Sequence, residues 1–133
     1  MRFDVMRPMG VLVLLAAVGC GGGDGGTVGP TAGVFKVVLT TPNADDGALL
    51  LTVAGGPVTA VEPAAQYQVL TAQPDSLTTR VLVTGNIAAG EVLRLQVPDT
   101  RRLSAYRASL AQAASRATFA QQALTSYSLA ITP

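Results

Sequence analysis

The chain has 133 residues, 49% of them hydrophobic and 13% charged, with nine basic against eight acidic side chains. Histidine is absent and cysteine occurs once. The near balance of charge excludes the basic footprint of a nucleic-acid-binding protein. The missing histidine removes the commonest general base and metal ligand, and a single cysteine excludes an internal disulfide.

Residues 1–19 have the pattern of an export signal. Arg2 and Arg7 supply positive charge, residues 11–18 form an apolar run, and small residues precede Cys20. A membrane-spanning helix needs about 20 apolar residues, and this run is shorter. The segment therefore predicts a signal peptide that is removed, although the sequence leaves open whether translation starts at Met1 or Met6.

Cys20 lies where a bacterial lipoprotein signal places its lipidated cysteine. Two or more acyl chains on such a cysteine, palmitate for example, anchor a protein stably to a membrane. Lipoproteins with Asp at the next position tend to stay in the inner membrane. Gly21 stands there instead, which favours the outer membrane, facing the periplasm or the cell surface. An ordinary cleaved secretory signal is the alternative.

Residues 20–33 predict the lipidated cysteine followed by a flexible Gly-rich linker, because glycine is costly to order and little here can be buried. The linker spans on the order of 20 Å. Removing Arg2, Arg7 and Asp4 with the signal leaves seven basic and seven acidic side chains. Attachment to a membrane would therefore depend on the lipid and not on charge.

Residues 34–133 predict one all-β domain. Short apolar segments alternate with turn signals such as Pro42 and Pro98, at the spacing of a β-sandwich or barrel. In the first segment Phe35, Val37 and Leu39 share a face, as apolar residues do in a half-buried strand. The strands expected in this part are 34–40, 48–54, 58–62, 67–71, 78–84 and 91–97.

Residues 103–124 fit two patterns. The segment is rich in helix-forming residues, and Leu103, Tyr106 and Leu110 would share a helical face. However, Tyr106, Ala108, Leu110 and Gln112 also alternate with polar or small neighbours. We expect a strand at 105–111 and a loop or short helical turn at 115–122, with a single long helix as the alternative. A last strand is expected at 126–132.

Residues 39–48, Tyr67, residues 95–99 and residues 127–129 resemble small bacterial lipoproteins of unknown function. The resemblance covers most of residues 34–131 and implies a cohesin-like or immunoglobulin-like shape, with no activity attached. The expected fold is therefore all-β: a single β-sandwich of about eight short strands, with a short helix near the C-terminus, after the signal peptide and linker.

Four residues are weak candidates for a metal site. Asn43, Asp45 and Asp46 place three oxygen-bearing side chains within four positions, and Asp99 follows a later strand. Ca²⁺ binds such oxygens, but the spacing is not that of an EF-hand. Asn and Asp also form turns by bonding their own backbone, so we expect turn chemistry, no metal and no cofactor.

Basic residues offer little for catalysis or binding. Arg101, Arg102 and Arg107 form the one basic cluster, which suits a carboxylate, a sugar acid or a lipid phosphate, but more often such residues are solvated. Lys36 is the sole lysine, and a Ser–Lys catalytic pair would need it desolvated beside a serine. Nothing local in the sequence indicates this.

Aromatic residues give the last candidates. Tyr67, Tyr106 and Tyr127 suit a sugar-binding face, but each lies in an alternating apolar pattern, which favours packing. We therefore expect a protein that is not an enzyme: a lipid-anchored envelope protein whose domain is structural or recognises protein or glycan by a sheet face or edge. The alternative is an accessory ligand- or calcium-binding lipoprotein, and a hydrolase comes third.

Overall fold

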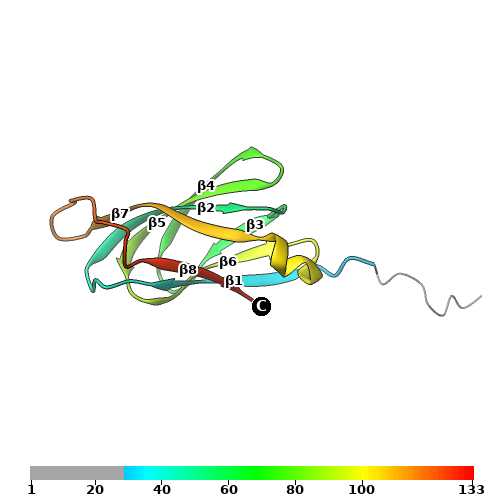
Figure 1. Cartoon of the computed structure of the whole chain (residues 1–133), viewed down its shortest axis with the longest axis horizontal. Helices are drawn as coiled ribbons and strands as arrows, with labels where there is room; N and C mark the ends of the chain where they lie inside the picture. The colour runs from blue at the N-terminus through cyan, green and yellow to red at the C-terminus, as the bar shows by residue number, and fades with distance from the viewer. Residues whose placement is uncertain (1–28) are drawn as a thin grey trace, which may run out of the picture.

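The computed structural model describes residues 29–133 (Figure 1). The expected signal peptide, Cys20 and most of the expected linker lie outside the described residues. The elements in chain order are β1 (Gly33–Thr40), β2 (Asp46–Ala54), β3 (Ala60–Pro63), β4 (Gln68–Asp75), β5 (Thr78–Ile87), β6 (Gly90–Val97), the 3₁₀ helix η1 (Thr100–Ala105), β7 (Arg107–Ser115) and β8 (Ser128–Thr132).

The strands form two four-stranded sheets, and every pairing is antiparallel. One sheet has the order β3-β6-β1-β8 and the other has the order β4-β5-β2-β7. We call them sheet A and sheet B. Strands β1 and β6 are central in sheet A, whereas β2 and β5 are central in sheet B. The expected all-β sandwich of about eight strands is thus confirmed.

The core lies between the sheets and is built from alternate residues of the central strands. On β1 the buried residues are Phe35, Val37 and Leu39, as their spacing predicts. Successive side chains of a strand point to opposite faces, so these positions supply one layer of the core. The other central strands supply the rest, with Leu49, Leu51, Val53, Val81, Val83, Ile87, Val92, Leu93, Leu95 and Val97 all buried.

The segment 103–124 contains a strand and no long helix. Residues Arg107–Ser115 form β7, which pairs with β2 along its whole length. The helix propensity of this segment is overridden because pairing with β2 buries Ala113 and half-buries Leu110. Helical structure in residues 29–133 is limited to η1, before β7. After β7 the chain turns back, and Gln121 bridges Ala114.

Two β-bulges make strands differ from what the alternation alone predicts. In β7 the register shifts opposite Leu50 and Leu51, so Gln112 is exposed and Ala113 is buried. The expectation that Gln112 continues the face of Leu110 is therefore wrong, because an extra residue in one strand reverses all later positions. In β5 the strand passes through Gly85, at φ +144°, and does not end there as expected.

Candidate interaction surface

The outward face of sheet A is charged. Glu62 of β3 lies opposite Arg94 of β6, Arg94 lies opposite Lys36 of β1, and Lys36 lies opposite Thr132 of β8. Arg94 also forms an ion pair with Glu91. This row of exposed charges is well solvated as it stands. Lys36 is exposed in this row, so its surroundings lack the desolvation that a catalytic lysine needs.

The outward face of sheet B carries an apolar row instead. Leu70 of β4 lies opposite Leu82 of β5, and Leu82 lies opposite Leu50 of β2. We call these three side chains the leucine row. Their neighbours along each central strand point into the core, so the row faces outward. Leu82 and Leu50 are half-buried, whereas Leu70 at the edge is 70% exposed.

The surroundings of the leucine row are nearly free of charge. On one side of the row Thr84 lies opposite Ala48, and on the other side Arg80 lies opposite Thr52. Residues 63–74, which lead into β4 and form most of it, contain no charged side chain. An apolar row whose face carries charge only at its rim, from Arg80 and Arg107, is typical of a surface that a partner covers.

Strand β4 also leaves a run of edge positions without a neighbouring strand, from Gln68 to Ala72. β3 has four residues, among them Glu62 and Pro63, and β8 has five. β7 is covered near its end, where the Gln122 N–H donates to the Ala113 carbonyl at 2.7 Å. β4 has eight residues and pairs with β5 alone among the strands of residues 29–133. Natural proteins usually blunt such edges with charge, proline or bulges, and β4 has these only at its end, where its register with β5 shifts between Ala72 and Asp75 and Pro74 has no N–H.

A hollow of about 490 Å³ lies beside the start of β4. It connects the leucine row with the β3–β4 corner, because Leu70 and Leu82 are part of its wall. Its lining is uncharged and consists of Pro63, Tyr67, Gln68, Val69, Leu70, Leu82 and Thr84. The hollow and the leucine row therefore form one continuous uncharged surface around β4.

The three tyrosines hold corners of the sandwich. The Tyr106 ring is buried, meets Phe35 edge-to-face with centroids 5.3 Å apart, and its hydroxyl donates to the Pro57 carbonyl at 2.6 Å. The Tyr67 hydroxyl accepts from the Ala88 N–H at 3.1 Å. Tyr106 therefore has no exposed ring to offer a sugar, and Tyr67 is half-buried in the wall of the hollow.

Asn43, Asp45 and Asp46 are close together, at the end of β1. Asp46 is fully buried and accepts from the Thr41 hydroxyl at 2.6 Å and from the Tyr127 hydroxyl. Asn43 donates to the Tyr127 oxygen at 2.8 Å. Burial, followed by the hydrogen bond to Asp46, raises the pKa of Tyr127 above its ordinary value.

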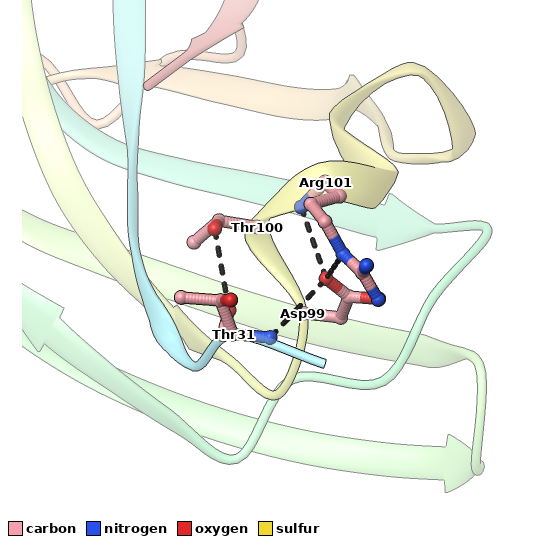
Figure 2. A network of polar contacts seen from close by, with 4 residues as sticks. All are labelled: Thr31, Asp99, Thr100 and Arg101. Carbon is pink, nitrogen blue, oxygen red and sulfur yellow. Dashed lines mark hydrogen bonds and ion pairs between the residues drawn. The ribbon is translucent and has the colours of Figure 1, made fainter. Parts of the chain in front are cut away.

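Asp99 does not join the three residues at the end of β1. It binds the backbone of Thr31, which precedes β1, so the length of β1 separates it from Asp46 (Figure 2). Within residues 29–133 no group of three or more His, Cys, Asp or Glu residues is placed to hold a metal ion. The carboxylates instead accept internal hydrogen bonds, Asp45 from the Ser115 hydroxyl at 2.6 Å.

Asp99, with Arg101 beside it, helps to hold the segment before β1 in place. Arg101 donates to both carboxylate oxygens of Asp99, at 3.0 and 3.1 Å, and the Thr100 hydroxyl donates to the Thr31 carbonyl at 3.2 Å (Figure 2). The hydrogen bond from Arg101 lowers the pKa of Asp99 to about 2. The expected basic cluster thus has Arg101 engaged with Asp99, while Arg102 and Arg107 are exposed.

No family model matches the chain, and no curated protein or solved structure matches it either. No helix in the part from residue 29 onward is long and apolar enough to cross a membrane.

The sequence did not reveal the leucine row. Its residues are apolar side chains on the outward side of three separate strands. The signal that was available is the nearly continuous apolar run of β2, residues 48–54. A run that is apolar on both sides is typical of a strand that is covered on both faces. Only the strand register shows that the outward leucines line up.

Proposed function

We propose that this chain is a lipid-anchored protein of the cell envelope whose sandwich domain is a non-catalytic interaction module. In this proposal Cys20 carries the lipid, residues 20–33 are the tether, and the leucine row with the open edge of β4 contacts the partner. The observation that carries the proposal is the open, uncharged edge of β4 beside an outward apolar row.

The anchor part of the proposal is supported by the sequence. The chain has one cysteine, and it follows a charged and then apolar leader and precedes a glycine-rich stretch. A thiol at this position can be alkylated by a diacylglycerol group, which holds a protein stably at a bilayer. The absence of an Asp after Cys20 favours the outer membrane.

The interaction part is supported by the contrast between the two outward faces. The charges on sheet A would lose solvation if a partner covered them. The leucine row gains on being covered, because full burial of an exposed leucine contributes about 1.5–3 kcal/mol. A partner, whether protein or glycan, is therefore expected on sheet B and not on sheet A.

Photo-crosslinking in intact cells tests this surface. A photoreactive phenylalanine at position 70 should give adducts with a partner, because this side chain stands at the exposed end of the leucine row. The matched control is position 77, where Leu77 is also exposed, at 52%, but lies in the turn between β4 and β5. Position 36 on sheet A is a second control.

Adducts at position 70 that exceed those at positions 77 and 36 at least fivefold are the expected result. Their composition identifies the partner as a protein or a glycan. Equal labelling at the three positions, or labelling strongest at position 36, would contradict the proposed surface. Melting temperatures of the three variants, measured alongside, establish that each one is folded.

A further inference from the structure

The open edge of β4 determines which backbone conformation a partner needs in order to pair with it. A strand edge presents unpaired N–H and C=O groups in a row, and the partner that satisfies them is another extended strand. Residues Gln68–Ala72 are the part of β4 that can accept such a strand, because the register with β5 shifts between Ala72 and Asp75 and Pro74 has no N–H to donate.

A second copy of the same strand fits this edge. Residues directly opposite each other in an antiparallel pair interact, and like charges there are destabilising. Because the segment Gln68–Ala72 is uncharged, two copies meet without repulsion. The other edges are less suited to self-pairing, since β3 has four residues and β8 has five, while β7 begins with the charged Arg107 and is bridged by Gln121 at Ala114.

We propose that two copies of this protein pair antiparallel through β4, forming one continuous eight-stranded sheet from their two B sheets. This inference rests on the proposed function, because it names the partner of the same surface. The twofold axis stands perpendicular to the sheet, so the outward faces of both copies lie on one side.

The leucine row fixes the register of the pair. Leu70 opposite Leu70 of the second copy brings the two most exposed apolar side chains of the surface together. Gln68 then lies opposite Ala72, and Val69 opposite Thr71. In this register the two leucine rows join into a single row of six leucines across the twofold axis. Pairing thereby covers part of each Leu70 side chain, which is exposed in a single copy.

The small size of this contact suits a protein that is tethered to a membrane. Five paired residues on each side bury less than the roughly 1,200 Å² of a stable standard interface, so the pair is weak in dilute solution. Chains held on one membrane by lipid meet at a much higher effective concentration. The anchor therefore favours pairing, and without it the pair forms only at high protein concentration, where the deciding experiment traps it covalently.

Disulfide trapping with Leu70→Cys is this experiment. The full chain carries Cys20→Ala, so that the introduced cysteine is the sole thiol, and it is oxidised at high protein concentration. Directly opposed Cβ atoms lie about 4.5–5.5 Å apart in an antiparallel pair, close enough for a disulfide after small adjustment. The control is Leu77→Cys, an exposed leucine outside the paired segment.

The expected result is covalent dimer from Leu70→Cys at a rate at least tenfold above that of Leu77→Cys. In sedimentation, Leu70→Lys should weaken self-association of the uncrosslinked protein at least tenfold, because it places two charges opposite each other, whereas Leu77→Lys should not. Equal disulfide rates for the two cysteine variants would overturn the pairing. If position 70 then still photo-crosslinks to another molecule in cells, the proposed surface stands and the second copy is the wrong partner. If neither the disulfide-linked dimer nor the photo-crosslinked adduct forms, both the proposed surface and the pairing are contradicted.

Discussion

Among the acidic residues of 29–133, Asp46 is fully buried. Its hydrogen bonds explain why the fold tolerates it there. A buried carboxylate is costly unless hydrogen bonds compensate for lost water. The hydroxyls of Thr41 and Tyr127 donate to its two oxygens. These bonds join the β1–β2 connection to the segment before β8, so residues that suggested a calcium site in the sequence serve the fold at this end of the sandwich.

Asp99 gives a prediction about acid stability. Its pKa is about 2 in the folded chain against an ordinary value of 3.8, because Arg101 stabilises the charged form. A lowered pKa means that the contribution to folding is present above about pH 4 and is lost as the pH falls from about 4 to 2. Asp99→Asn should therefore lower the melting temperature at pH 6, by a few degrees at most because the pair is exposed.

Thermal melts at pH 6 and pH 2 test the predicted direction of this pH dependence. The difference between the wild-type chain and Asp99→Asn should shrink toward zero at pH 2, where the wild-type carboxyl is half-protonated or more. A difference that is unchanged at pH 2 would show that the loss comes from the backbone contact to Thr31 and not from the charge.

At the scale of single elements, β6 gives the clearest test of the register. Leu95 is fully buried and lies between Phe35 of β1 and Val61 of β3. Leu95→Asp places an unpaired charge in the core, which costs several kcal/mol and rivals the whole stability of a small domain. We expect this variant to be unfolded by circular dichroism at 25 °C.

The matched control is Leu70→Asp, the same substitution at an exposed strand position. It should keep a cooperative melt within a few degrees of the wild-type chain. A folded Leu95→Asp variant would mean that β6 has a different inward face.

Most strands could be predicted from the sequence because alternation reports which side of a strand is buried. β1 follows it directly, with Phe35, Val37 and Leu39 buried as expected, whereas a bulge in β6 leaves both Val92 and Leu93 buried. The bulge in β7 could not be predicted, since Ala111, Gln112 and Ala113 fit either face and pairing with β2 decides between them. The partners of the candidate polar residues were hidden for a similar reason: Asp46 meets Tyr127, 81 positions away.

The whole molecule combines a charged face, an apolar face and a fastened N-terminal end. Thr31 is held beside η1 by Asp99 and Thr100, whereas the connection from β7 to β8 lies at the opposite end of the sandwich (Figures 1 and 2). Phe119, 84% exposed, belongs to that far connection. A chain that is anchored through Cys20 would thus hold the sandwich by one end and leave both outward faces accessible.

The intact mass of the mature protein from membranes, measured beside that of a Cys20→Ala variant, tests the lipid anchor directly. We expect a wild-type chain that begins at Cys20, carries added acyl mass and is found with the membranes, and a variant without this mass in the soluble fraction. An unlipidated wild-type chain in the soluble fraction would contradict the anchor. The sandwich would then be a freely exported domain, and a membrane would no longer concentrate its copies.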